Sequence, residues 1–188
     1  ARMMLDCSRK PDLLAQFPFP HRLWITYRLT PARLEVETQV ENLATEPLPL
    51  AIGYHPYFQL SDAPRDEWQV TIPARERMVL SAQLIPTGEK QPNPYAPGTP
   101  LKGIVLDDVF SGLEENATFR VKGRQQEITV RYGADYRIGV VYAPAGQNFI
   151  CFEPMTAPTN AFNTPGAYKT IAPGETWRES YFITAAGF

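Results

Sequence analysis

The chain has 188 residues, of which 44% are hydrophobic and 20% charged, a composition that favours a folded globular protein over a disordered one. The formal net charge is −2 and the basic residues are scattered, so the sequence lacks the footprint of a nucleic-acid-binding protein. No apolar stretch approaches the length of a membrane span, and two cysteines cannot form a disulfide framework, so we expect a cytoplasmic protein without membrane contact.

Alternation of apolar and polar residues is the dominant pattern, beginning in residues 23–29 and 33–41. A period of two predicts strands with one wet face, and the Thr30-Pro31-Ala32 segment between them predicts a hairpin turn. Residues 118–121 and 127–132 repeat this arrangement around a Lys-Gly-Arg turn. Further strands are expected over residues 67–72, 137–142, 148–153 and 179–184.

Helical patterning is poor because 19 prolines are spread through the sequence and interrupt any long stripe at helical spacing. Residues 88–103 contain four of these prolines and predict a long surface loop. Short strands separated by turns rich in proline and glycine predict an all-β fold, an antiparallel β-sandwich. The length predicts a single domain over residues 1–188.

Glu153 is the first candidate for chemistry, because it ends the apolar run Phe149-Ile150-Cys151-Phe152 and precedes a loop rich in proline and asparagine. Burying a carboxylate costs free energy, since its charged form loses water. A protein tolerates this where the carboxylate is paired, or where a raised pKa serves proton transfer.

His55 is the second candidate and lies in the segment Gly53-Tyr54-His55-Pro56-Tyr57-Phe58. The following proline restrains His55 to an extended backbone, and a fixed imidazole is a good acid or base near neutral pH. A core histidine bonded to a carbonyl is the alternative. The other histidine, His21, is expected to lie on the surface.

Asp107 and Asp108 form the third candidate site, although taken alone the two residues favour a turn after the loop with both acids solvated. Adjacent residues of an extended chain point to opposite faces, so at most one of the two acids can face a given cleft. Asn160 and Asn163 fit either Asx turns or polar contacts to a sugar or to Glu153. The sequence offers no metal-ligand spacing and no phosphate-binding glycine loop, so no metal and no other cofactor is expected.

These motifs, in this order, resemble the aldose 1-epimerase (galactose mutarotase-like) family, as does the Pro-Gly-Glu turn at residues 173–175 before the last strand. The resemblance implies a large antiparallel β-sandwich, an isomerase of carbohydrate metabolism, a small-molecule sugar as partner, and no cofactor. It implies that Glu153 is the catalytic base, that His55 is the catalytic acid, and that Asp107 grips sugar hydroxyls. Tyr57 and Phe58 are implied to line the cleft, while the sequence carries no signal for an oligomeric state.

One departure from the family is that nothing here resembles its upstream segment, in which an Asn-His pair and an arginine contact the sugar. The chain therefore resembles the later, C-terminal portion of a mutarotase-like domain. Two other functions stay open: a hexose-6-phosphate 1-epimerase, for which Arg75, Arg77 or Lys102 would hold the phosphate, and a non-catalytic carbohydrate-binding domain.

Overall fold

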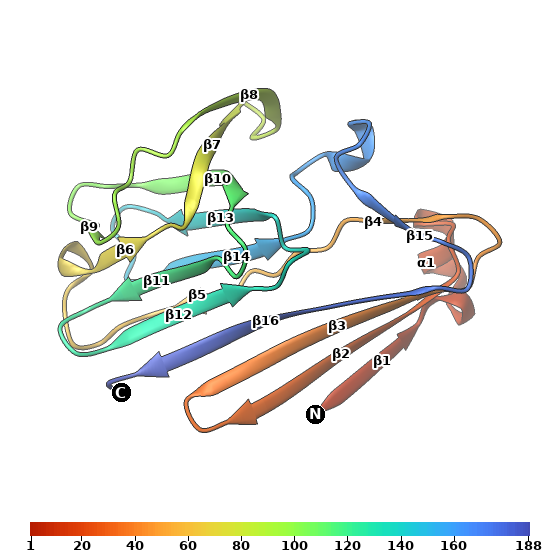
Figure 1. Ribbon diagram of the computed structural model, residues 1–188, viewed down its shortest axis with the longest axis horizontal. Helices are drawn as coiled ribbons and strands as arrows, with labels where there is room; N and C mark the ends of the chain where they lie inside the picture. Colours follow the sequence, from red (N-terminus) through yellow and green to blue (C-terminus); the bar gives the residue numbers. More distant parts are fainter.

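The structure is a computed structural model that describes residues 1–188, and antiparallel strands make up most of it (Figure 1). The strands are β1 (Arg2–Asp6), β2 (His21–Thr30), β3 (Arg33–Asn42), β4 (Leu48–Leu50), β5 (Tyr57–Phe58), β6 (Gln69–Thr71), β7 (Ala74–Leu80), β8 (Pro86–Pro92), β9 (Thr99–Pro100), β10 (Leu106–Leu113), β11 (Thr118–Lys122), β12 (Glu127–Tyr132), β13 (Ile138–Ala143), β14 (Ile150–Met155), β15 (Lys169–Ile171) and β16 (Thr176–Ala186).

Helical structure is confined to α1 (Pro11–Gln16) and to three single 3-10 turns, η1 (Cys7–Arg9), η2 (Arg65–Glu67) and η3 (Ala161–Asn163). This agrees with the weak helical patterning of a sequence in which proline is so frequent. None of these helices has the length and apolar character needed to cross a membrane.

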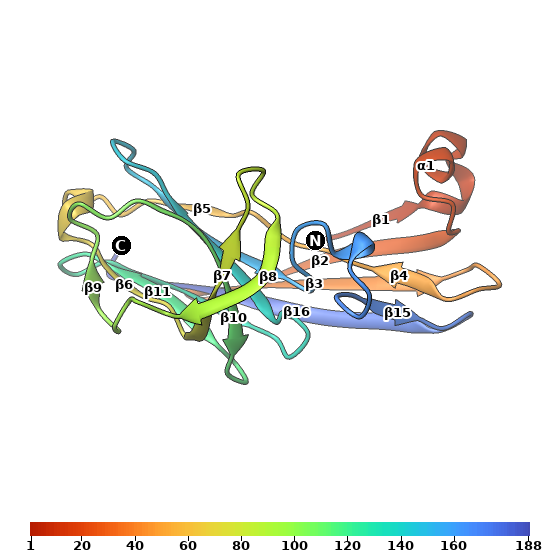
Figure 2. The same ribbon diagram turned by 90° about the horizontal axis from the view of Figure 1, so that it is seen from above.

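Two large sheets form the layers of a β-sandwich, as Figures 1 and 2 show together. One sheet has eight strands in the order β1-β2-β3-β16-β12-β11-β6-β9, and the other has six in the order β5-β14-β13-β10-β7-β8. A small two-stranded sheet joins β15 to β4. The antiparallel β-sandwich predicted from the sequence is therefore confirmed.

The predicted hairpin at residues 23–41 forms between β2 and β3, with Ala32 in the turn at a φ of 59°. Burial along β3 alternates, because every second side chain points to the core. Strand β16 pairs along nearly the whole of β3, which joins the last segment of the chain to one of its first. On the other side β16 pairs with β12 of the second predicted hairpin.

The main core lies between the two large sheets. Phe119 of β11, in the eight-stranded sheet, contacts Phe152 of β14, in the six-stranded sheet, with ring centroids 5.7 Å apart. Other buried residues of this core include Val70, Leu106, Phe110, Val121, Val130, Tyr132, Val141 and Ile150. Burial of this apolar set is the main stabilising term of the fold.

The prediction of a surface loop at residues 88–103 is wrong in part, because this stretch contains most of β8 and all of β9. Both strands lie at an edge, β8 of the six-stranded sheet and β9 of the eight-stranded sheet. Proline has no N–H to donate to a ladder, and an edge strand needs only one side paired. Proline-rich sequence therefore indicates an edge strand as readily as a loop.

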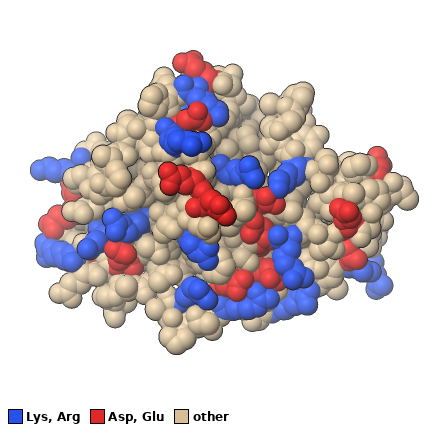
Figure 3. All heavy atoms as spheres, in the orientation of Figure 1, with Lys and Arg blue, Asp and Glu red and all other residues tan.

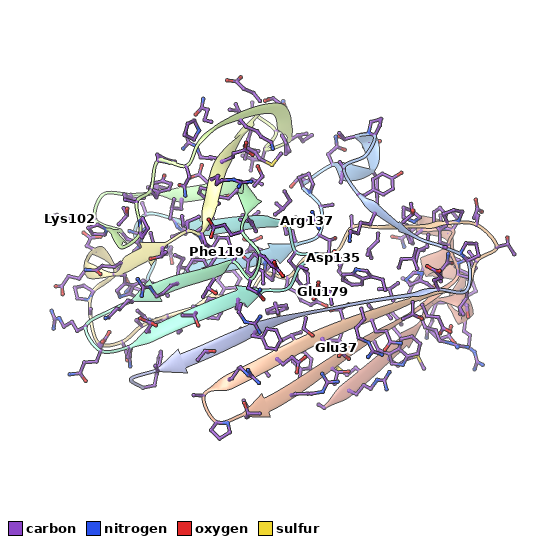
Figure 4. The ribbon with its side chains drawn as sticks, in the orientation of Figure 1. Glu37, Lys102, Phe119, Asp135, Arg137 and Glu179 are labelled. Atoms are coloured by element: carbon purple, nitrogen blue, oxygen red, sulfur yellow. The ribbon has the colours of Figure 1, made fainter.

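Polar contacts tie the loop before β13 to β16, and Figure 4 labels two of the residues involved, Asp135 and Glu179. The backbone N–H of Asp135 donates to Glu179 at 2.8 Å, and the indole N–H of Trp177 donates to the Asp135 carboxylate at 2.7 Å. On the face drawn in Figure 3, acidic and basic side chains are interspersed rather than grouped by sign.

Gly139 of β13 lies close against the opposite sheet. A Cβ at this position would lie 2.4 Å from Cζ of Phe119, which Figure 4 labels on β11. We expect Gly139→Ala to destabilise the protein by about 1–3 kcal/mol through overpacking, as measured by denaturant unfolding.

The matched control for this substitution is the same change in a Phe119→Leu background, in which the smaller side chain leaves room for a methyl group. The cost of Gly139→Ala should fall in that background. An equal cost in both backgrounds would contradict the proposed contact.

Candidate functional site

Segment 52–58 runs antiparallel to β14 in one continuous register. Ile52 and Thr156 exchange hydrogen bonds, Gly53 bridges to Met155, and Tyr57 pairs with Cys151. The same register, carried through the residues between these pairs, sets His55 directly opposite Glu153. Side chains that are opposite each other in an antiparallel pair project to the same face with Cβ atoms about 5 Å apart.

The two main candidates therefore meet. His55 Nε2 lies 3.0 Å from Glu153 Oε1. The Glu153 side chain is only 11% exposed, whereas that of His55 is 48% exposed. The pair thus consists of a fixed, nearly dry carboxylate and an imidazole that solvent and ligands can reach.

Burial raises the pKa of Glu153 above the ordinary glutamate value, because the charged form loses water. The imidazole of His55 opposes this shift, since its cationic form favours the carboxylate, while the negative charge of Asp107 adds to it. A carboxyl with a raised pKa beside an imidazole is an arrangement suited to proton transfer.

Aromatic rings surround the imidazole. Tyr57 stacks on His55 with centroids 4.9 Å apart and an interplanar angle of 18°, and Tyr142 of β13 lies edge-on to His55 at 6.3 Å. Phe149 contacts both tyrosines. Tyr57 is 59% exposed, so this cluster offers an apolar surface of the kind on which sugar rings stack.

Asp107 reaches this face through the register of three strands. It lies opposite Tyr142, and Tyr142 lies opposite Cys151, so all three side chains project to the outer face of the six-stranded sheet. Its neighbour Asp108 points to the other face, where Arg77 lies 3.5 Å away and the Tyr95 hydroxyl donates to it at 3.4 Å. Both acids belong to β10, and the alternative of a solvated turn is wrong.

Phe58 belongs to the core rather than to the site. It follows Tyr57 in β5, so its side chain points to the inner face, where its ring lies 6.1 Å from that of Phe152. Asn160 and Asn163 are bonded to each other at η3, and no hydrogen bond joins either residue to Glu153. The asparagines thus form a local turn, with Asn160 at a φ of 63°, and a contact from either to a sugar stays a prediction.

Tyr142 and Cys151 are residues of the site that the sequence did not single out. Cys151 is fully buried, and burial raises the pKa of its thiol to about 12. Its spacing from Glu153 was a signal in the sequence, because residues two apart in a strand share a face. No such signal existed for Tyr142, whose place depends on the pairing of β13 with β14.

Five hollows on this molecule have linings that include neither His55 nor Glu153. One of about 560 Å³ lies where the loop after β10 meets the loop before β13, with Arg75, Tyr136 and Arg137 in its lining. The side chains His55, Cys151 and Glu153 form the cluster whose ligand atoms could hold a metal ion.

Comparison with solved structures defines the class of this fold. A galactose mutarotase-like protein from Clostridium acetobutylicum superposes with a TM-score of 0.87 at 19% identity, covering 100% of this chain and 62% of that one. A putative aldose 1-epimerase from Escherichia coli K12 gives a TM-score of 0.74 at 21% identity, covering 90% and 62%. The chain thus has the galactose mutarotase-like sandwich fold.

The sequence profile described as aldose 1-epimerase matches residues 2–184, so this chain belongs to the aldose 1-epimerase family. The uncharacterized protein YihR of Escherichia coli (strain K12) is 24% identical over 156 residues, which cover 79% of this chain and 50% of that protein. The chain therefore spans about half the length of this relative and about 62% of the two structures above.

The charge of Asp107 provides a test of the site's electrostatics. Removing it with Asp107→Asn should lower the pKa of Glu153, because Asp107 is one of the groups that raise it. The measurement is an NMR titration of the Glu153 side-chain carboxyl. Asp108→Asn is the matched control and should leave that titration in place, since Asp108 faces the opposite side of the sheet.

Proposed function

We propose that this chain carries the acid–base centre of an aldose 1-epimerase, which interconverts the α and β anomers of a hexose. The observation that carries the proposal is the contact between His55 and Glu153, a cross-strand pair 3.0 Å apart in a member of this family. The chemistry requires such adjacency, because the hydroxyl that loses a proton and the ring oxygen that gains one are bonded to the same carbon, C1.

In the proposed reaction Glu153 takes the proton of the C1 hydroxyl while His55, as imidazolium, gives a proton to the ring oxygen. The bond between C1 and the ring oxygen breaks as the C1 carbonyl forms. Rotation about C1–C2 then presents the other face of the aldehyde. Reclosure runs the transfers in reverse and returns both side chains to their starting protonation states.

The surroundings support these roles. Desolvation makes the Glu153 carboxylate a stronger base than a solvated one, and the half-exposed imidazole can be reached by a sugar from solvent. Tyr57 offers a stacking surface for the sugar ring, and Asp107 projects its carboxylate onto the same face to accept hydrogen bonds from hydroxyls.

Phosphorylated hexoses are less well supported as substrates. Of the basic residues considered for a phosphate, Arg77 lies 3.5 Å from the carboxylate of Asp108. Arg75 lines the hollow beyond the end of β10, and Lys102 lies with Arg65 and Glu67 at a different one. These cations therefore do not gather around the His55–Glu153 pair.

Exchange spectroscopy on glucose and galactose anomers tests the proposal. Glu153→Gln and His55→Asn should each reduce the enzyme-dependent exchange rate by about 10²–10⁴-fold, because each removes one proton-transfer group. His21→Asn is the matched control. His21 is the only other histidine and its ring contacts the carbonyl of Phe19, so this variant should leave the exchange rate unchanged.

Two outcomes would count against the proposal. Unchanged exchange in both Glu153→Gln and His55→Asn would remove these residues from the mechanism. Saturable sugar binding without any enzyme-dependent exchange would instead assign a carbohydrate-binding role to the same face.

The raised pKa of Glu153 also predicts the pH dependence of the reaction. The base must be ionised, so kcat/KM should fall as the pH drops through the pKa of Glu153, and this acid limb should lie above the ordinary glutamate value. Asp107→Asn should move the limb to lower pH. A limb that stays in place in this variant would contradict the assignment of Glu153 as the base.

A further inference from the structure

Three side chains with different ligand chemistry converge at the proposed acid–base centre. The ring nitrogen of His55, the sulfur of Cys151 and a carboxylate oxygen of Glu153 all lie within 4.8 Å of one another. Cys151 has no role in the proton transfers proposed above, so its presence in this cluster is unexplained by them.

Strand geometry fixes the cluster. Cys151 and Glu153 lie two residues apart in β14 and share its outer face, and His55 lies opposite Glu153 in the register of the neighbouring segment. Ligands on paired strands are held more firmly than ligands on loops, so the three donors are largely pre-positioned.

We propose that His55, Cys151 and Glu153 bind one Zn²⁺ ion, and that this ion inhibits the acid–base centre. Imidazole nitrogen, thiolate sulfur and carboxylate oxygen are the three ligand types that zinc takes in proteins. A tetrahedral zinc ion holds its ligand atoms roughly 3.3–3.8 Å apart, so shifts of about 1 Å in these side chains form the site. A water molecule would complete the tetrahedron.

Inhibition follows from which atoms the ion occupies. A zinc ion bonded to His55 Nε2 and Glu153 Oε1 takes the lone pairs that the proton transfers need, and it stands where the sugar's C1 oxygens would lie. This part of the inference rests on the proposed function, whereas the binding of the ion does not.

Binding is an exchange of a proton for the metal at sulfur. The S–H bond of Cys151 breaks and its proton passes to solvent as the Zn–S bond forms. Where His55 is an imidazolium, its Nε2 proton also passes to solvent as the Zn–N bond forms, and no oxidation state changes. Burial raises the pKa of this thiol to about 12, so the ion rather than the protein environment has to stabilise the thiolate. The half-exposed imidazole is the side from which the ion enters, because Cys151 itself is fully buried.

The donor set also predicts selectivity among ions. A thiolate and an imidazole favour Zn²⁺, Co²⁺ and their neighbours, whereas Mg²⁺ and Ca²⁺ require oxygen ligands. Co²⁺ is therefore a suitable probe, since its bond to a thiolate gives a charge-transfer absorption that its bonds to nitrogen and oxygen do not give.

The experiment titrates the metal-free full chain with Co²⁺ and then displaces Co²⁺ with Zn²⁺. We expect one ion per chain, a thiolate-to-cobalt band that Zn²⁺ abolishes and Mg²⁺ does not, and loss of that band in Cys151→Ser. Zinc affinity should fall at least about tenfold in Cys151→Ser and in His55→Asn, because loss of a ligand should cost no less than loss of a residue that merely orients one.

Cys7→Ser is the matched control, since Cys7 is the only other cysteine and is also buried. The band and the zinc affinity should be unchanged in this variant. Circular dichroism of each variant confirms that it is folded, and His55→Asn tests the site independently should Cys151→Ser fail to fold.

Absence of the band, its survival in a folded Cys151→Ser, or its loss in Cys7→Ser would overturn the metal site. Half-inhibition of anomer exchange at the Zn²⁺ concentration that half-saturates the site would support the inhibitory role. Exchange that is unaffected by saturating Zn²⁺ would overturn it. A band that requires Cys151 in a protein without anomer exchange supports the metal site and counts against the proposed function alone.

Discussion

The register between segment 52–58 and β14 is the constraint on which the site depends. Thr156 fixes one end of it, donating its N–H to the Ile52 carbonyl and accepting the Ile52 N–H at its hydroxyl, both at 2.9 Å. At the other end Tyr57 pairs with Cys151. A slip by one residue would turn His55 toward the core and away from Glu153, because side chains alternate between faces. Pro56, which has no N–H, interrupts the ladder without changing its register.

The same alternation places core residues and candidate-site residues on opposite faces of a single strand. In β14, Phe152 faces inward and packs against Phe58 and Phe119, while its neighbours Cys151 and Glu153 face outward. The close approach of Phe119 to Gly139 holds β13 against the opposite sheet, and β13 in turn positions Tyr142 beside the pair. Packing of the inner face thus determines the geometry of the outer one.

Glu153 is a buried carboxylate whose charged form depends on one neighbouring side chain. Its carboxylate loses water on burial, and the only nearby group that favours its charged form is an imidazole that can itself give up a proton. A permanent cation at the same place would stabilise the carboxylate more strongly but could not give a proton to the sugar in the proposed reaction. The charged form of the pair is therefore only weakly favoured over the neutral form, which suits proton transfer. The lone pairs of both side chains also remain available to a metal ion.

Local patterns in the sequence determined the class of fold and part of its strands. Alternation over residues 23–41 and 118–132 specifies two hairpins on its own, since both partners and the turn lie within one short stretch. The motif around His55 and the position of Glu153 after an apolar run also identified both residues as candidates without any coordinates. Proline concealed the edge strands β8 and β9, because its sequence signal is the same in a loop and at a sheet edge.

Tertiary structure alone decided which side chains of different strands share a face. Asp107 and Tyr57 were placed on one face with His55, and Cys151 recognised as its neighbour, only once strands distant in the sequence were paired. The physical reason is that a strand's own sequence reveals its two faces but not its partner or register, which depend on how the whole core packs.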